Sequence, residues 1–229
     1  MPIPPQDFTV PDLDTVLSQA IPFDKERWMP LLPDATWWPD ELDACPEHGR
    51  WPRVDRRTVF TIARRAGTAQ GNRHLLVAAL VWGTGTKAQS VHRRGQIFAH
   101  TAAAEIDARL GVALTTLREK GAAEAYWAFN NEQKIPHLGP AFFTKVLYFA
   151  GEAGIPGPHH PLILDSVVAG ALKNLGLVHT AWPDNGWTTA QYGEYLGALH
   201  GLATERSVQP DQIEAALFHH GKQAPRASA

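Results

Sequence analysis

Residues 135–165, IPHLGPAFFTKVLYFAGEAGIPGPHHPLILD, contain a Pro/Gly turn, an apolar helical pattern with a single lysine, and a loop that ends at an aspartate. Pro140 suits the first position of a helix, because the N–H that proline lacks would have no partner there. Residues 140–150 are almost all apolar, and Lys145 is the one charged residue among them. Burying an ammonium group in such surroundings is costly. The stretch therefore predicts a buried helix whose lysine serves a chemical purpose.

Asp165 follows the apolar residues 161–164 and precedes a second apolar helical pattern at residues 166–175. This position predicts the N-cap of a helix, where aspartate is favoured. A simpler interpretation exists for each residue, with Lys145 at the exposed edge of its helix and Asp165 acting only as a cap. The presence of both in one turn, helix, loop and helix unit favours a site formed by the pair.

Helical patterns dominate the rest of the chain. Residues 72–82 include an uninterrupted apolar run, which predicts a buried helix, and residues 55–66 combine an apolar face with an arginine-rich one. Other helical patterns lie at residues 12–20, 87–94, 102–110, 121–131, 192–204 and 209–218. No segment shows the two-residue alternation of a strand convincingly. The sequence predicts an all-α fold of about nine helices with no substantial sheet.

Composition excludes several classes of protein. The 229 residues are 44% hydrophobic and 19% charged, which is typical of a globular chain. No apolar run is long enough to span a membrane, and the first residues lack the features of a signal peptide. We expect a cytoplasmic protein that acts as a monomer, away from membranes. The single cysteine, Cys45, excludes an internal disulfide and a four-cysteine iron–sulfur cluster.

Charge is segregated along the chain although the net charge is only −2. Residues 1–49 hold ten acidic and two basic side chains, and residues 50–94 hold ten basic side chains and one acidic, Asp55. We expect the basic block to contain phosphate contacts. The alternative is a solvated helix face over which the arginines are scattered. His159 and His160 have no cysteine or carboxylate partner at zinc spacing, so we expect no metal site.

Residues 70–175 resemble the helix-hairpin-helix DNA glycosylase superfamily, in particular its 8-oxoguanine DNA glycosylase branch. The resemblance rests on residues 135–139, IPHLG, for the hairpin pattern apolar-Pro-Gly-apolar-Gly, on Lys145, and on residues 162–165, LILD. Two departures stand out. His137 replaces the first glycine of the hairpin, and Lys145 lies six residues after Gly139, where many members have the lysine two residues after that glycine. Four residues make about one helical turn, so the amine is expected on the same face.

The resemblance implies a helix-hairpin-helix glycosylase fold in which two helical lobes flank a cleft. Residues 1–53 are then an acidic arm, rich in proline and tryptophan, that packs on the body. Residues 54–222 form the glycosylase-like domain with its hairpin at residues 135–140. Residues 223–229 are expected to be a disordered tail.

The activity that the resemblance implies is excision of a damaged or modified purine from double-stranded DNA, with 8-oxoguanine as the expected base. Lys145 would displace the base and form a Schiff base with the sugar, which makes strand cleavage by β-elimination accessible. Burial lowers the pKa of a lysine, as this step requires. Asp165 would stabilise positive charge on the sugar, or orient and deprotonate the amine.

DNA contacts are expected from two places. The hairpin, at His137 and Gly139, would present backbone N–H groups to a phosphate, and family members often bind a monovalent cation there. No other cofactor is expected. The polar turn after residues 72–82 would place Thr84 in the gap left by the flipped nucleotide, with Lys87 and Arg93 reaching phosphates.

A flipped base requires apolar or aromatic surfaces, and Trp82, Phe142 and Trp187 are the candidates for them. Two other functions stay open. One is a non-catalytic helix-hairpin-helix DNA-binding protein with a regulatory or defence role. The other is an interaction protein that has kept the helical scaffold without binding DNA.

Overall fold

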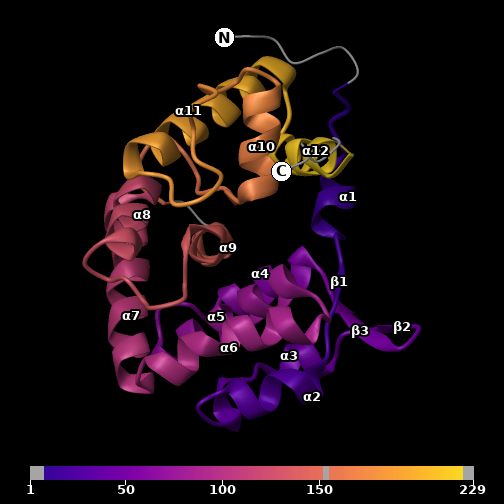
Figure 1. Cartoon of the computed structure of the whole chain (residues 1–229), viewed down its shortest axis with the longest axis vertical. Helices are drawn as coiled ribbons and strands as arrows, with labels where there is room; N and C mark the ends of the chain where they lie inside the picture. Colours follow the sequence, from indigo (N-terminus) through magenta and orange to yellow (C-terminus); the bar gives the residue numbers. More distant parts are fainter. Residues whose placement is uncertain (1–7, 152–154, 224–229) are drawn as a thin grey trace.

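The computed structural model describes residues 8–151 and 155–223, and in these residues the chain is mostly helical (Figure 1). Two groups of helices form the lobes. The first contains α4 (Arg56–Ala63), α5 (Ala69–Thr84) and α6 (Ala88–His100), and the second contains α10 (Ser166–Asn174), α11 (Thr189–Arg206) and α12 (Pro210–Gln223). Between them run α7 (Ala103–Lys120), α8 (Ala122–Asn130) and α9 (Pro140–Ala150). The predicted all-α class with two lobes is confirmed.

The arm that precedes α4 contains only short elements. Its helices are α1 (Leu13–Leu17), α2 (Lys25–Trp28) and α3 (Asp40–Asp43), with 3-10 turns at Met29–Leu31 and Ala35–Trp37. Its strands are β1 (Ile21–Pro22), β2 (Glu47–His48) and β3 (Trp51–Val54), in the antiparallel order β1-β3-β2. The helical pattern at residues 12–20 predicted α1, which is shorter than expected. The other elements were not predicted, because each is too short to show a helical or strand period. Buried tryptophans, Trp28, Trp37 and Trp38, hold the arm in place.

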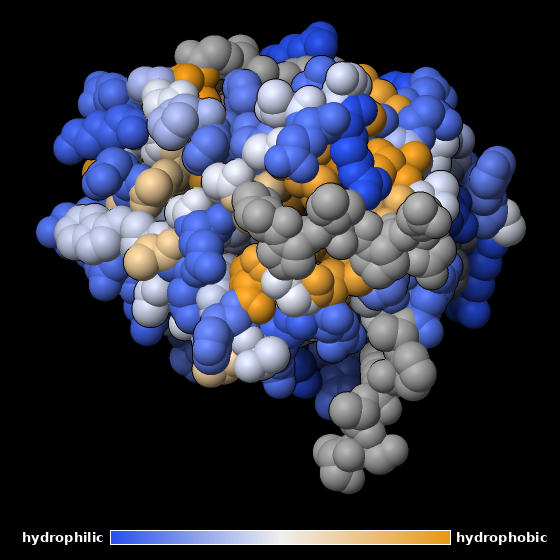
Figure 2. Space-filling model, turned by 90° about the horizontal axis from the view of Figure 1, so that it is seen from above, coloured by the Kyte–Doolittle hydropathy of each residue, from blue (hydrophilic) through white to orange (hydrophobic). Residues whose placement is uncertain are grey.

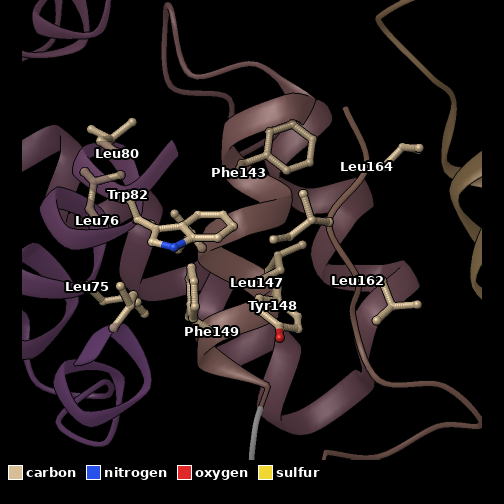
Figure 3. Packing of buried hydrophobic residues seen from close by; sticks show 14 of the residues in the cluster. Leu75, Leu76, Leu80, Trp82, Phe143, Leu147, Tyr148, Phe149, Leu162 and Leu164 are labelled. Atoms are coloured by element: carbon tan, nitrogen blue, oxygen red, sulfur yellow. The ribbon is translucent and has the colours of Figure 1, made fainter. Parts of the chain in front are cut away.

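Packing of α9 against α5 forms the centre of the molecule. Every residue of α5 from Leu75 to Trp82 is buried, in agreement with its uninterrupted apolar run. The Trp82 ring lies edge-on against Phe149 of α9, with 5.5 Å between ring centroids, and Phe60 of α4 meets Phe149 at 5.0 Å. Figure 3 shows Trp82 and Phe149 together at this contact. Helix α9 is apolar on most sides, and it packs against α5 and α4 of the first lobe and against α8 and α7.

Polar side chains cover most of the face seen in Figure 2, and apolar ones gather near its centre.

Helix boundaries follow the sequence closely where the pattern is strong. The prediction for residues 140–150 is confirmed by α9, whereas α7 continues ten residues beyond the predicted end at residue 110. Gly111 interrupts the pattern of α7, but burial of Ala113, Leu114 and Leu117 keeps the helix intact. Gln223, assigned to the tail, is the last residue of α12, and residues 224–229 lie outside the described residues.

The hairpin turn between α8 and α9 has a backbone that explains one departure from the family pattern. His137 has φ +65°, in the left-handed region that favours glycine. The Leu138 N–H donates to the Ile135 carbonyl at 3.1 Å and closes the turn. The His137 ring stacks obliquely on His100, with 4.6 Å between ring centroids. The turn thus keeps the conformation of the missing glycine, and histidine occupies it.

Replacing His137 tests this backbone conformation. His137→Val should lower the free energy of unfolding by about 1–2 kcal/mol, because a β-branched residue is disfavoured at positive φ. His137→Asn is the control, since asparagine tolerates this region while it also removes the imidazole ring. Urea denaturation measures both. Equal losses for the two variants would show that the ring contact with His100, and not the backbone, determines the stability of the turn.

Candidate functional site

A cavity of about 190 Å³ lies where the two lobes and the arm meet. Its wall combines Gln19 and Ile21 of the arm with residues from α4, the end of α5, α9, the start of α10 and α12. The residues are Gln19, Ile21, Arg56, Trp82, Gly83, Thr84, Gly85, Lys145, Ile163, Asp165, Glu214 and Phe218. Lys145 and Asp165 therefore face one cavity. A larger hollow of about 820 Å³ lies over the arm around Leu42 and Trp51 and contains neither of them.

Lys145 is buried, with 5% of the residue exposed. Its Nζ donates to the Ala141 carbonyl at 2.7 Å and lies 3.5 Å from Asp165 Oδ2. Burial lowers the pKa of the ammonium group, and the carboxylates of Asp165 and Glu214 oppose that effect without overcoming it. The interpretation of Lys145 as an exposed edge residue is wrong. At a given pH, the neutral, nucleophilic form of this amine is therefore more populated than that of a lysine in water.

Asp165 combines the two roles considered for it. Its Oδ1 caps α10 by accepting from the N–H groups of Val167 and Val168, at 3.0 and 3.1 Å. The other oxygen, Oδ2, is the one that faces Lys145. Because the cap fixes the carboxylate through one oxygen, the second is held in place beside the amine.

Two further charged residues of the cavity were not predicted. Glu214 of α12 and Arg56 of α4 are 2% and 1% exposed, and their side chains form an ion pair at 2.9 Å. A signal for Glu214 was present, since it is the one charged residue in the apolar run at residues 213–218, as Lys145 is in α9. Arg56 gave none, because it is one of many arginines in a basic stretch.

The three aromatic candidates for the base pocket occupy different places. Trp82 lines the cavity, and its Nε1 donates to the Gln19 carbonyl at 3.1 Å. Phe142 lies beside the amine, with its ring centroid 5.2 Å from Lys145 Nζ. Trp187 is fully buried away from the cavity, and its Nε1 donates to the Pro183 carbonyl at 2.9 Å. Phe218, which the sequence did not single out, joins Trp82 in the cavity wall.

Gly83 allows Lys145 to approach α5. A Cβ at this position would lie 2.8 Å from Lys145 Cδ and 2.9 Å from Phe142 Cε1, closer than real Cβ atoms come to other heavy atoms. The absence of a side chain at Gly83 is therefore what leaves room for the lysine chain against the end of α5.

The candidate DNA contacts lie at the hairpin turn and around the break between α5 and α6. His137 and Gly139 are exposed at the hairpin. Thr84 lines the cavity, and its hydroxyl donates to the Leu80 carbonyl of its own helix at 2.6 Å. Lys87 and Arg93 are exposed on α6 or its N-cap, and neither forms an ion pair within the part of the chain that the structure describes.

Several arginines of the basic block form ion pairs with acidic side chains of the same chain. Arg57 pairs with Asp14 and Arg65 with Glu41, so the acidic arm supplies partners for the basic helix that follows it. Arg56 is buried against Glu214. The segregation of charge in the sequence thus reflects in part how the arm packs, and Lys87 and Arg93 are among the basic residues left for an external partner.

The described residues hold neither a metal site nor a membrane span. Within residues 8–151 and 155–223, no group of three or more His, Cys, Asp or Glu side chains is arranged to hold a metal ion. In the same residues, no helix is both long and apolar enough to cross a bilayer.

The site resembles that of helix-hairpin-helix DNA glycosylases. It combines a hairpin turn, an apolar helix with a buried lysine, and an aspartate at the N-terminus of the next helix. A family model described as "Putative 8-oxoguanine DNA glycosylase OGG-like protein" matches residues 14–218. The chain belongs to this family of OGG-like DNA glycosylases, which confirms the resemblance seen in the sequence. No curated protein and no solved structure matches it.

Removal of the buried amine should stabilise the protein in a pH-dependent way. The pKa of Lys145 is lower in the folded chain than in the unfolded chain, where it is about 10.4. Below that pH, protonation of the lysine therefore stabilises the unfolded chain relative to the fold. Lys145→Met should therefore raise the free energy of unfolding at pH 7, and the gain should shrink as the pH rises towards 10. Urea denaturation at both pH values measures it.

Lys120→Met is the control, since Lys120 is exposed at the end of α7. It should not reproduce the gain in stability at pH 7. A gain for Lys145→Met that grows with pH would contradict the lowered pKa of the buried amine.

Proposed function

We propose that the protein is a bifunctional DNA glycosylase and abasic-site lyase that excises a modified purine, with 8-oxoguanine as the expected base. The observation that carries the proposal is the buried amine of Lys145, which lies 3.5 Å from Asp165 Oδ2 in a cavity between the lobes. Membership of an OGG-like DNA glycosylase family supports the class of reaction. The expected substrate is one molecule of double-stranded DNA bound by one copy of the chain.

In the proposed reaction, the neutral amine of Lys145 attacks C1′ of the deoxyribose. The bond between C1′ and the base breaks, and its electron pair leaves with the base, which takes up a proton. The nitrogen loses one proton, the C1′–O4′ bond breaks as O4′ takes up a proton, and a protonated Schiff base remains. Loss of a proton from C2′ then expels the 3′ phosphate. Asp165 stabilises the positive charge that develops on the sugar, or accepts a proton from the amine.

The cavity suits a single extruded base. At about 190 Å³ it is smaller than the roughly 300–1,000 Å³ pockets that take drug-sized ligands. Trp82 and Phe218 offer apolar surfaces to a ring, and Glu214 adds a carboxylate. Contact with these side chains would offset the few kcal/mol that flipping a base out of the duplex costs.

The hairpin and α6 are proposed to hold the DNA backbone. His137, Gly139, Lys87 and Arg93 are exposed, and backbone N–H groups at the start of a helix attract phosphate. A monovalent cation fits the hairpin chemically, because the carbonyls of residues 136–138 accept none of the hydrogen bonds found in the described part of the chain. These carbonyls would hold the cation, and its positive charge would favour a phosphate at the hairpin.

Borohydride trapping on a duplex with 8-oxoguanine opposite cytosine tests the reaction. The wild-type protein should form a covalent adduct, and Lys145→Gln should form none. Asp165→Asn should slow trapping by about 10²–10⁴-fold, because asparagine preserves the cap of α10 but lacks the charge. Asp12→Asn is the matched control, since Asp12 caps α1 in the same way, through the Thr15 N–H, outside the cavity.

The outcome separates this proposal from the alternative of a non-catalytic DNA-binding protein. That alternative predicts salt-dependent DNA binding by both the wild-type protein and Lys145→Gln, with no adduct on any modified base. An interaction protein without a nucleic acid partner would bind none of these duplexes.

Gly83→Ala tests how the lysine is positioned. The new Cβ would push against Lys145 Cδ and the Phe142 ring, so the amine should move and trapping should slow by about 10²-fold. Gly111→Ala is the control, because nothing lies within 4 Å of a Cβ there. Its trapping rate should equal that of the wild type. Normal trapping by Gly83→Ala would mean that Lys145 has more room than the structure shows.

A further inference from the structure

Arg56 connects three other residues of the cavity wall, Gln19, Trp82 and Glu214, and also Tyr148 of α9. Its guanidinium donates to Gln19 Oε1 at 2.9 and 3.0 Å, to the Tyr148 hydroxyl at 3.0 Å and to Glu214 Oε2 at 2.9 Å. It also lies over the Trp82 ring, 5.0 Å from the centroid. A guanidinium that is 1% exposed is tolerated only when it is paired and hydrogen-bonded in this way.

The charge of Arg56 matters because of where Glu214 lies. Glu214 and Asp165 line the same cavity as Lys145. Two carboxylates facing one amine would favour the ammonium form, which cannot act as a nucleophile. Arg56 contributes a positive charge within the same wall and is held against Glu214. The cavity can thus contain a second carboxylate without becoming a strongly negative site.

We propose that Arg56 is a positioning residue of the Lys145 site. Its guanidinium holds the Glu214 carboxylate in the cavity wall and balances its charge. Asp165 is then the carboxylate beside the amine whose charge no arginine balances. The inference rests on the proposed function, because it assigns Arg56 a role in keeping Lys145 reactive. It concerns the charge around the amine and assigns no chemical step to Arg56.

Other titratable groups packed around Lys145 do not disturb this balance. Tyr148 donates to Asp211 Oδ2 at 3.1 Å, and Tyr195 donates to the Ile163 carbonyl at 2.6 Å. Burial raises the pKa of both phenols, so they stay neutral. Arg94 of α6 lies over the Phe142 ring, 4.3 Å from its centroid, and is not part of the cavity wall.

The test is a titration of the Lys145 Cε resonance by ¹³C NMR, assigned from its absence in Lys145→Met. Glu214→Gln leaves Arg56 uncompensated, so the titration midpoint of Lys145 should fall by about one pH unit, which is a tenfold change in the protonation equilibrium. The double variant Arg56→Met/Glu214→Gln removes both charges together, and its midpoint should return to the wild-type value. Replacing both members of a buried pair is tolerated far better than removing one.

The same proteins are then trapped with borohydride on a duplex that contains an abasic site, so that base recognition does not enter. The pH at which trapping reaches half its maximum rate should move with the NMR midpoint. Asp107→Asn is the control, because it breaks the ion pair with Arg73, which is remote from the cavity, and should move neither value.

An unchanged Lys145 midpoint in Glu214→Gln, or a double variant that keeps the shift of the single one, overturns the role of Arg56. Absence of any adduct on abasic or modified DNA overturns the proposed function instead. In that case the NMR midpoints still decide whether Arg56 balances Glu214. If Glu214→Gln fails to fold, Glu214→Asp, which keeps the charge but withdraws it from Arg56, should shift the midpoint upward, and no upward shift would overturn the proposal.

Discussion

Burial of the Lys145 amine is the constraint on which the rest of the structure depends. An ammonium group loses its hydration in the cavity, and one backbone carbonyl and one carboxylate at 3.5 Å replace only part of it. The fold must offset this cost through the surrounding packing. Helix α9 does so because it is apolar on most of its surface and is covered by α5 and α4 from one side and by α8 from another. The packing of a large hydrophobic core, and not the contacts of the amine itself, offsets the free-energy cost of burying Lys145.

The arm takes part in this arrangement. Gln19 accepts from Arg56 and its backbone carbonyl accepts from Trp82, so a segment outside the helical body holds two residues of the cavity wall. The salt bridges from Arg57 and Arg65 to acidic residues of the arm fix it against α4. The described part of the arm, residues 8–53, therefore both covers the body and completes the cavity wall, to which it contributes Gln19 and Ile21.

Sequence patterns predicted the parts of the fold that depend on local chemistry. Helix α9, the cap at Asp165 and the buried α5 follow from apolar runs and from residues with strong positional preferences. Glu214 had the same signal as Lys145, a lone charge in an apolar helix, and could have been found by applying that criterion throughout. Arg56 could not, because its burial depends on partners 92 and 158 residues away in the sequence. Tertiary packing also decides that Phe218 of α12, and not Trp187, reaches the cavity.

The position of Lys145, one turn beyond the usual family position, agrees with the direction of side chains on a helix. Side chains tilt towards the helix N-terminus, so a long chain reaches back over the preceding turn. The amine of Lys145 does this and meets the carbonyl of Ala141, which is the residue two positions after Gly139. Gly83 leaves the space through which the chain passes, and the cap on α10 holds Asp165 at the place where the amine arrives. The direction of the lysine side chain and a glycine on the facing helix thus bring the amine of Lys145 to Asp165.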